Sequence, residues 1–290
     1  MKNLIKETHK YISLIKFAHT VFAMPFAMIG FVLAITKDEY HFSLRLLILI
    51  ILCMIFARNA AMGFNRLADR KFDSLNPRTS MREIPSGKLD YRPVAIFVVV
   101  NAGLFIAATG FINRLTLILS PVALLVILGY SLTKRFTSLC HFILGLGLSL
   151  APVGAYISVT GTFSLLPVIY SLIVITWVSG FDIIYALQDD EFDRQQKLYS
   201  LPSVAGRSRA LSVSGMVHAA TALLVIWAGI EGNGSYFFWI GAAIFVGLLI
   251  YQHIIVRPDD LRKVTLAFQT TNGLASLLFA VFVITDILIR

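Results

Sequence analysis

Long apolar stretches alternate along the whole chain with short charged segments. A helix needs about 20 mostly apolar residues to cross a bilayer, and nine stretches reach or approach that length. They fall at Phe17–Thr36, Leu44–Phe64, Pro93–Ile112, Thr116–Leu132, Leu139–Val159, Leu165–Tyr185, Leu211–Ile230, Tyr236–Val256 and Val264–Ile289. The pattern predicts an all-α integral membrane protein with about nine transmembrane helices, in which residues 1–290 form one transmembrane domain.

The composition is that of a protein surrounded by lipid. Of the 290 residues, 57% are hydrophobic and 14% are charged, and the mean hydropathy is +0.79. Soluble domains carry about 25% charged residues, so the composition excludes an ordinary soluble protein. The formal net charge of +9 would favour nucleic-acid binding in a soluble protein. Here the basic residues lie between apolar stretches, so we expect the lipid bilayer as a partner and no nucleic acid.

The basic residues gather in alternate connections. They lie before the first stretch and in every second connection after it: Lys2, Lys6, Lys10, Lys16, Arg66, Arg70, Lys71, Arg78, Arg82, Lys88, Arg92, Lys134, Arg135, Arg194, Lys197, Arg207, Arg209, Arg257, Arg262 and Lys263. The other connections hold few, namely Lys37, Arg45 and Arg114. Because basic residues stay on the cytoplasmic side, we expect a cytoplasmic N-terminus in a multi-pass protein of the cell's inner or plasma membrane.

Two groups of polar residues with helical spacing follow apolar stretches on the predicted cytoplasmic side. Asn65, Asp69 and Asp73 follow the second stretch at intervals of four, and Asp189 and Asp193 follow the sixth with the same interval. Residues four apart share one face of a helix. The two clusters agree in spacing, in membrane side and in position at the end of an even-numbered stretch. This agreement indicates a weak internal repeat.

Basic side chains lie close to both acidic clusters in the sequence. The two connections that begin with the clusters, at about residues 65–92 and 185–210, are longer than simple turns. The basic residues of interest are Arg78, Arg82, Lys134 and Arg135. Magnesium prefers oxygen ligands and is commonly shared between a few carboxylates and substrate phosphates, and basic side chains bind the remaining phosphate charge. The combination predicts a site for a Mg²⁺–diphosphate complex on the cytoplasmic side.

Two ionisable residues lie one layer deeper in the membrane. Arg58 precedes Asn65 by seven positions, and Asp182 precedes Asp189 by seven. Seven residues make about two helical turns, so each lies on the face of its cluster. An arginine inside a span is costly and therefore indicates function. Arg58 either binds the carboxylate of an aromatic acid or pairs with Asp182 or a backbone carbonyl, and Asp182 orients an acceptor, accepts a proton or pairs with Arg58.

Four further residues are candidates for contact with a substrate. Tyr130 and Tyr185 lie at span ends, where they either contact the diphosphate or the acceptor or serve as interfacial anchors. His19, together with Asn59, either lines an acceptor pocket or packs inside the bundle.

Several of these residues belong to longer motifs. Residues 65–87 read NRLADRKFDSLNPRTSMREIPSG, residues 182–193 read DIIYALQDDEFD, and residues 130–135 read YSLTKR. In these three segments the chain resembles the UbiA superfamily of intramembrane prenyltransferases, with its NxxxDxxxD motif, its DxxYAxxDxxxD motif and its Tyr…Lys-Arg loop. Glu83 and Ile84 stand where the family's Arg-Pro-Leu-Pro-Ser-Gly segment has Pro and Leu.

The resemblance implies a fold and a reaction. The fold would place about nine helices around a central cavity that opens toward the cytoplasmic interface and sideways into lipid. The reaction would be Mg²⁺-dependent transfer of a polyprenyl group from polyprenyl diphosphate to an acceptor, most often an aromatic ring. The expected metal ligands are Asn65, Asp69, Asp73, Asp189 and Asp193, the expected catalytic residues are Asp69, Asp73, Asp182, Asp189 and Asp193, and the expected substrate-binding residues are Arg58, Asn65, Arg78, Arg82, Tyr130, Lys134, Arg135 and Tyr185.

Three hypotheses for the function follow, and the first two differ in the acceptor. The first is an aromatic acid, 4-hydroxybenzoate or a dihydroxynaphthoate relative, in ubiquinone or menaquinone biosynthesis. The second keeps the fold but changes the acceptor to the haem or chlorophyll type. The third is a secondary transporter, which the position of the clusters disfavours because transporter sites usually lie near the membrane midplane.

Overall fold

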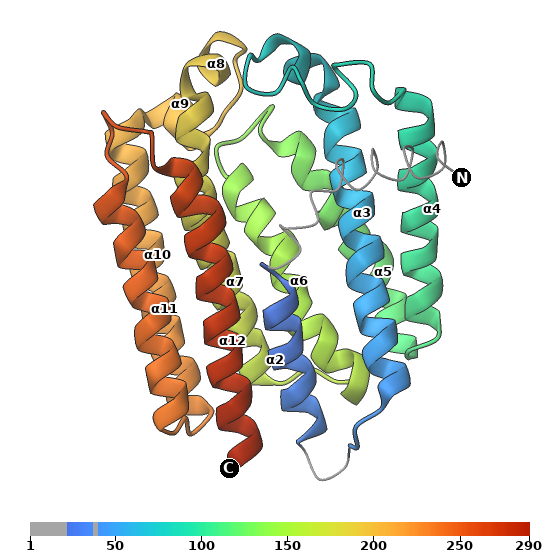
Figure 1. Cartoon of the computed structure of the whole chain (residues 1–290). Coiled ribbons are helices and arrows are strands. Elements are labelled where there is room, and N and C mark those ends of the chain that lie inside the picture. Colours follow the sequence, from blue (N-terminus) through green and yellow to red (C-terminus); the bar gives the residue numbers. More distant parts are fainter. Residues whose placement is uncertain (1–21, 37–39) are drawn as a thin grey trace, which may run out of the picture.

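The computed structural model describes residues 22–36 and 40–290, and within these residues the chain forms helices and no strands. The long helices and their flanking turns are α2 (Met24–Ile35), α3 (Leu44–Leu75), α4 (Tyr91–Gly110), α5 (Arg114–Thr133), α6 (Cys140–Thr160), α7 (Leu165–Ala186), η2 (Leu187–Asp189), α8 (Asp190–Gln195), α9 (Leu201–Ala205), α10 (Arg207–Glu231), α11 (Tyr236–Ile255), the π-helical turn η3 (Leu266–Thr271) and α12 (Asn272–Ile289). Figure 1 shows them as one elongated bundle.

The number of spans agrees with the sequence pattern. Eight described helices are long and apolar enough to cross a membrane, and the shorter α2 lies within the first predicted span. Residues 17–21 of that span lie outside the described residues. The prediction of an all-helical, multi-pass integral membrane protein is confirmed.

The helix that carries the first acidic cluster is longer than predicted. We expected a span to end at Phe64 and a connection to begin at Asn65, but α3 continues without interruption to Leu75 and is 32 residues long. It ends at Asn76, whose backbone is extended (ψ 118°). Pro77 follows, and a residue before proline is sterically pushed out of the helical region. The cluster residues therefore lie on the rigid end of a helix.

Helix α7, which leads directly into the turns η2 and α8 that carry the second cluster, lies in the interior of the bundle. It packs against α6 and α10 along its length, and Trp177 at its centre is fully buried. Trp177 packs on Phe26 of α2 and Phe245 of α11, with ring centroids 5.3 and 5.8 Å away. Its indole nitrogen donates a hydrogen bond to Asn272 Oδ1 at 2.9 Å. This packing fixes the height and rotation of α7, and with them the positions of the acidic residues at its end.

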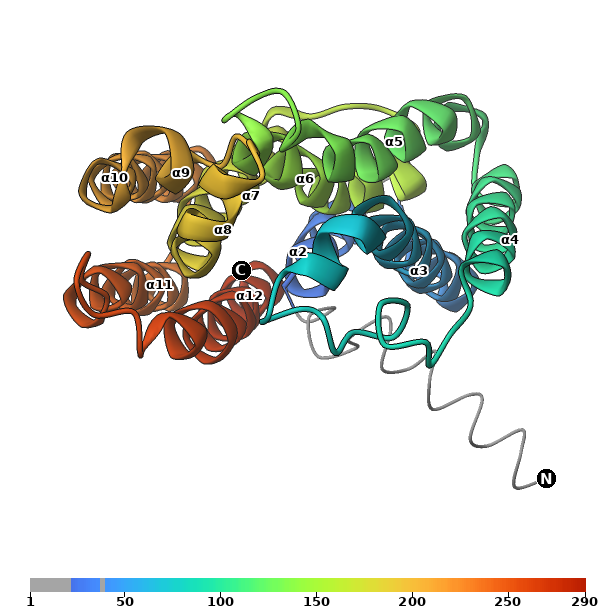
Figure 2. The same cartoon turned by 90° about the horizontal axis from the view of Figure 1, so that it is seen from above.

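Both clusters lie at the same end of the bundle. In Figure 1 the end of α3, the turns α8 and α9 and the connection after α3 are all at the top, and the C-terminus is at the bottom. Seen from that end in Figure 2, the connection after α3 crosses from α3 toward α7 and α8. The two long connections therefore form a cap over one end of the helices.

Candidate active site

A polar cavity of about 280 Å³ lies under this cap. Side chains from α3, α5, α6, α7 and the two long connections line it. The lining includes every residue predicted as a metal ligand, a catalytic residue or a substrate-binding residue: Arg58, Asn65, Asp69, Asp73, Arg78, Arg82, Tyr130, Lys134, Arg135, Asp182, Tyr185, Asp189 and Asp193. Residues separated by more than 100 positions thus share one space.

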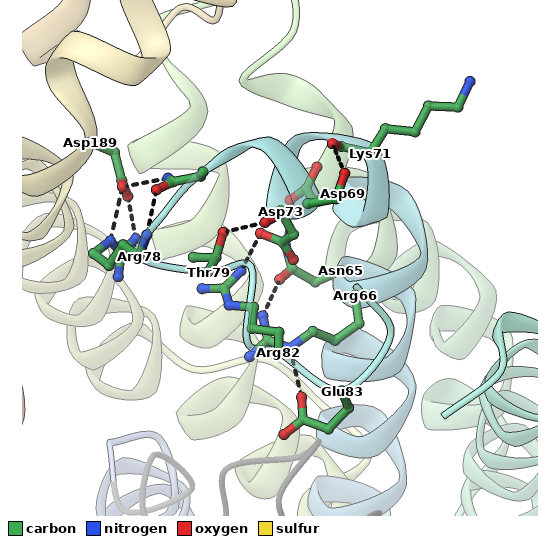
Figure 3. Close-up of polar contacts among 12 residues, drawn as sticks. Asn65, Arg66, Asp69, Lys71, Asp73, Arg78, Thr79, Arg82, Glu83 and Asp189 are labelled. Atoms are coloured by element: carbon green, nitrogen blue, oxygen red, sulfur yellow. Dashed lines mark hydrogen bonds and ion pairs between the residues drawn. The ribbon is translucent and has the colours of Figure 1, made fainter. Parts of the chain in front are cut away.

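The first cluster is held from two sides. Asp73 Oδ1 lies 2.6 Å from Arg82 Nη1, and Thr79 Oγ1 donates to the main-chain oxygen of Asp73 at 3.1 Å. Asn65 Nδ2 donates to Asp69 Oδ2 at 3.1 Å, and Arg135 Nη2 lies 3.4 Å from Asp69 Oδ1. Figure 3 shows that the connection after α3 folds back toward that helix, so that Arg82 contacts Asp73 on α3.

The second cluster is bound by residues from distant segments. Arg78 forms a two-pronged ion pair with Asp189 and donates from Nη1 to the Tyr185 hydroxyl at 2.9 Å. Asn76 Nδ2 also donates to Asp189 Oδ1, at 2.8 Å. Asp193 Oδ1 lies 2.8 Å from Lys134 Nζ. Each aspartate of the two clusters therefore has a basic partner.

The basic partners outside the membrane-spanning segments keep their charge. Burial alone would lower the pKa of Lys134, but the neighbouring Asp193 carboxylate outweighs it and raises that pKa above its ordinary 10.5. Burial also opposes the charge of Arg78, yet its hydrogen bonds to Asp189 raise its pKa above the ordinary value. Both side chains are cations at neutral pH and can bind an anion such as diphosphate.

A second cavity, about 370 Å³ and mainly apolar, adjoins the first. Arg58, Tyr130, Leu144 and Leu148 line both cavities, so these residues stand at the junction. No hydrogen bond or ion pair joins Arg58 to any residue in the described part of the chain, and its Nε is buried. The alternative in which Arg58 pairs with Asp182 is not observed, because Asp182 Oδ2 lies 2.6 Å from His141 Nδ1 instead.

The arrangement of oxygen donors suits magnesium without forming a closed metal site. Among residues 22–36 and 40–290, no three acidic, His or Cys side chains are close enough together to hold a metal ion. Asp73 Oδ2, however, is buried and accepts no hydrogen bond from a described residue. A buried carboxylate oxygen without a hydrogen-bond partner is able to take a cation such as Mg²⁺ that is shared with a diphosphate.

Some residues of the site could not be found from motif spacing. His141 and Asn76 contact the acidic residues directly, and Ser200 Oγ donates to Asp193 Oδ2 at 2.6 Å. Of the two alternatives for Asn59, packing inside the bundle is the one observed: its Nδ2 donates to Asn101 Oδ1 of α4 at 3.0 Å, and it is not among the described residues that line the two cavities. Its proposed companion His19 lies outside the described residues.

Comparison with known proteins places this geometry in a family. Residues 23–281 match the UbiA prenyltransferase family. The chain belongs to that family. This confirms the resemblance that the motifs indicated, and it makes the protein a prenyltransferase rather than a transporter.

Curated UbiA relatives match over most of their length. The 4-hydroxybenzoate octaprenyltransferase of Aeromonas salmonicida (strain A449) is 29% identical over 245 residues, which cover 83% of this chain and 83% of that protein. The 4-hydroxybenzoate octaprenyltransferase of Burkholderia ambifaria (strain AMMD) is 30% identical over 236 residues, 81% of each chain.

Solved structures of UbiA homologues share the fold. The apo structure of the homologue from Aeropyrum pernix K1 matches with a TM-score of 0.79 and 30% identity, over 93% of this chain and 97% of that one. The homologue from Archaeoglobus fulgidus bound to DMAPP and Mg²⁺ matches with a TM-score of 0.72 and 22% identity, over 97% and 100% of the two chains. The predicted UbiA-type helical fold is confirmed.

Proposed function

We propose that this UbiA prenyltransferase transfers a polyprenyl group from its diphosphate to an aromatic acid, 4-hydroxybenzoate or a dihydroxynaphthoate relative, in ubiquinone or menaquinone biosynthesis. The observation that carries the proposal is the guanidinium of Arg58, which has no hydrogen-bond or ion-pair partner among the described residues and lies at the junction of a polar and an apolar cavity. The relatives named as 4-hydroxybenzoate octaprenyltransferases support it.

The polar cavity would bind the diphosphate. Asn65, Asp69, Asp73, Asp189 and Asp193 would hold Mg²⁺, as the homologue bound to DMAPP and Mg²⁺ supports. Bound magnesium would neutralise charge on the departing diphosphate. Arg78, Arg82, Lys134 and Arg135 now pair with the aspartates. When the carboxylates take metal, these cations would turn to the phosphate oxygens, where they stabilise the negative charge that develops as the allylic C–O bond breaks.

The apolar cavity would take the isoprenoid tail. Its lining comes mainly from apolar side chains of α3, α5 and α6, and it begins at Arg58 and Tyr130, where the polar cavity ends. A tail bound there would place the reactive allylic carbon at the junction of the two cavities. The apolar walls would also keep water from the allylic cation.

Arg58 would bind the acceptor. A guanidinium can hold a carboxylate through two parallel hydrogen bonds, and a charged side chain without a partner inside a span is costly. An acid held by Arg58 would present its ring to the allylic carbon at the junction. The relatives named as 4-hydroxybenzoate octaprenyltransferases favour an aromatic acid over an acceptor of the haem or chlorophyll type. On this assignment the site would face the cytoplasm, with the protein in the inner or plasma membrane.

The test uses the full chain in lipid nanodiscs with Mg²⁺ and a labelled polyprenyl diphosphate. We expect a prenylated product with 4-hydroxybenzoate or 1,4-dihydroxy-2-naphthoate, and none with EDTA. Arg58→Ala should raise the acceptor KM by about 10- to 100-fold, because hydrogen bonds to charged groups contribute about 1.5–3 kcal/mol. The donor KM should change little.

The matched control is Arg114→Ala, at the opposite end of the bundle. It should leave both KM values unchanged. If Arg58→Ala and Arg114→Ala behave alike, Arg58 does not bind the acceptor. If neither acid is prenylated while the diphosphate is still turned over, the acceptor belongs to another class.

A further inference from the structure

A buried histidine that no sequence motif singled out lies directly behind Asp182. His141, near the start of α6, is 2% exposed. Its Nδ1 lies 2.6 Å from Asp182 Oδ2, and its Nε2 lies 3.1 Å from the main-chain nitrogen of Leu201. Both ring nitrogens therefore have partners, one from α7 and one from the start of α9.

The Leu201 contact determines which ring nitrogen carries hydrogen. A backbone N–H can only donate, so Nε2 must accept and carries no hydrogen. The ring of a neutral histidine has its hydrogen on the other nitrogen, Nδ1. Nδ1–H therefore donates to Asp182, and Oδ2 of Asp182 accepts.

The second oxygen of Asp182 remains available to the cavity. Asp182 lines the polar cavity together with Arg58. Its Oδ1 accepts no hydrogen bond from the residues that the structure describes, and it is not among the buried, unsatisfied atoms. Fixing Oδ2 on His141 leaves Oδ1 as the oxygen that a substrate can reach.

We propose that His141 is a positioning residue that holds Asp182 as a carboxylate with Oδ1 directed at the hydroxyl of the acceptor. This rests on the proposed function.

As the C–O bond of the prenyl diphosphate breaks, its electron pair leaves with the diphosphate. A π pair of the ring forms the new C–C bond while the hydroxyl proton passes to Asp182, which leaves a ring ketone with the prenyl group and a hydrogen on the attacked carbon. That C–H bond then breaks and its electron pair restores the aromatic ring; the ring oxygen takes its proton back from Asp182, and the C–H proton leaves to water. Asp182 performs this step only if His141 keeps it oriented and unprotonated.

The contact with Leu201 also connects Asp182 with the residues that are proposed to bind the prenyl diphosphate. The residues just before Leu201 bind the second acidic cluster and its basic partner. Ser200 Oγ donates to Asp193 Oδ2 at 2.6 Å, and Tyr199 N donates to Lys134 O at 2.7 Å. His141 thus fixes Asp182 relative to the groups proposed to hold the diphosphate.

The chemistry of the two partners suggests a conservative variant. A glutamine side chain offers one donor and one acceptor on the same amide group. His141→Gln can therefore donate to Asp182 and accept from Leu201 N–H, whereas His141→Leu can do neither. His218 provides a matched control, since it is also buried and hydrogen-bonded, to His253 and to Trp177 O, and is not among the described residues that line the two cavities.

The experiment measures how the labelled donor is divided between the prenylated acid and the free prenyl alcohol formed by water. We expect His141→Leu to lower transfer to the acid by at least about tenfold, while donor KM and alcohol formation stay within about twofold of the wild type. His141→Gln should recover most of the transfer, and His218→Leu should leave the division unchanged. Equal loss of transfer and alcohol formation in His141→Leu, or no recovery in folded His141→Gln, would overturn the proposal.

A second measurement does not depend on activity. Nitrogen-15 NMR of histidine-labelled wild-type protein near neutral pH should show His141, assigned by its loss in His141→Gln, as the neutral Nδ1–H form. A doubly protonated ring or the Nε2–H form would overturn the proposal. If wild-type protein prenylates neither acid, the proposed function fails, and the NMR result still decides the role of His141 toward Asp182.

Discussion

Arg78 and Asp189 form an ion pair across 111 positions of sequence. Arg78 lies in the connection after α3, and Asp189 lies in the turn after α7. The pair joins the two halves of the cap over the polar cavity, and Tyr185 supports it by accepting a hydrogen bond from Arg78. Tyr185 in turn stacks on Phe268, with ring centroids 4.1 Å apart, so the cap is anchored to the start of the last span.

Removing the guanidinium of Arg78 should weaken donor binding. We expect Arg78→Ala to raise the KM for prenyl diphosphate by about 10- to 100-fold, the size of a lost charged hydrogen bond of about 1.5–3 kcal/mol. Arg78→Lys should recover little, because an ammonium cannot reproduce the two-pronged geometry. The control is Arg70→Ala, an exposed arginine on α3 that donates to Leu67 O. A donor KM that is equal in the Arg78 and Arg70 variants would contradict the expectation.

Magnesium and diphosphate should bind to the site together. The aspartates are already paired with Arg and Lys side chains, so metal alone must displace these side chains. Metal with diphosphate instead supplies a new partner for the aspartates and another for the basic side chains. Inorganic diphosphate with Mg²⁺ should therefore raise the thermal midpoint of the wild-type protein more than the two separate shifts combined.

Asp73 should be central to this effect, since its Oδ2 has no hydrogen-bond partner in the described part of the chain. Asp73→Asn should raise the Mg²⁺ concentration that gives half-maximal transfer by at least about tenfold and abolish the joint thermal shift. Asp90→Asn, at an exposed carboxylate before α4, is the control. The idea is wrong if Asp73→Asn keeps the wild-type response to Mg²⁺.

Local regularities of the sequence were sufficient to predict the spans and the acidic clusters. The length of the apolar stretches located the helices, because a helix must contain enough apolar residues to cross the bilayer. The interval of four placed Asp69 beside Asp73 because a helix repeats nearly at that interval. The same reasoning failed at the end of α3, where Pro77 and not the change to polar residues stops the helix.

Contacts between distant segments were beyond the sequence pattern. Nothing near His141 in the chain indicates that Leu201 and Asp182 meet there, because that contact depends on how α6 and α7 pack. The sequence left both alternatives for Asn59 open for the same reason. Its side chain faces α4 and Asn101, and only the rotation of α3 in the bundle decides that direction.

The charge of Lys134 predicts how donor binding depends on pH. Its pKa in the folded protein lies above the ordinary 10.5. Because folding raises this pKa, the ion pair with Asp193 stabilises the folded protein fully at any pH below the pKa of Lys134 in the unfolded chain. That stabilisation is lost only as the pH rises through the higher pKa of Lys134 in the folded protein. Between about pH 7 and pH 9, the charge should therefore not change.

The measurement is the ratio of donor KM values for Lys134→Met and the wild type, because the ratio cancels the titration of other groups. We expect Lys134→Met to raise the donor KM by about 10- to 100-fold and the ratio to stay constant from about pH 7 to pH 9. A ratio that falls toward one by about pH 9 would mean that Lys134 loses its proton near neutrality.

The apolar cavity should limit which donors are accepted. Gly154 of α6 lines this cavity, and a Cβ added there would meet no described atom within 4 Å. Gly154→Leu therefore places its side chain in open space where the tail is proposed to lie. We expect kcat/KM for a long polyprenyl diphosphate to fall by at least about tenfold, while dimethylallyl diphosphate, whose single isoprene unit stays near Arg58, remains within about twofold.

The chain offers a closely matched control for this substitution. Gly103 of α4 is also an interior helix position with open space around an added Cβ, but it is exposed on the outer surface of the bundle and does not line the cavity. Leucine favours helix over glycine at both positions, so neither variant should lose stability. Gly103→Leu should use long and short donors as the wild type does. If Gly154→Leu lowers the use of both donors equally, or of neither, the tail does not occupy this cavity.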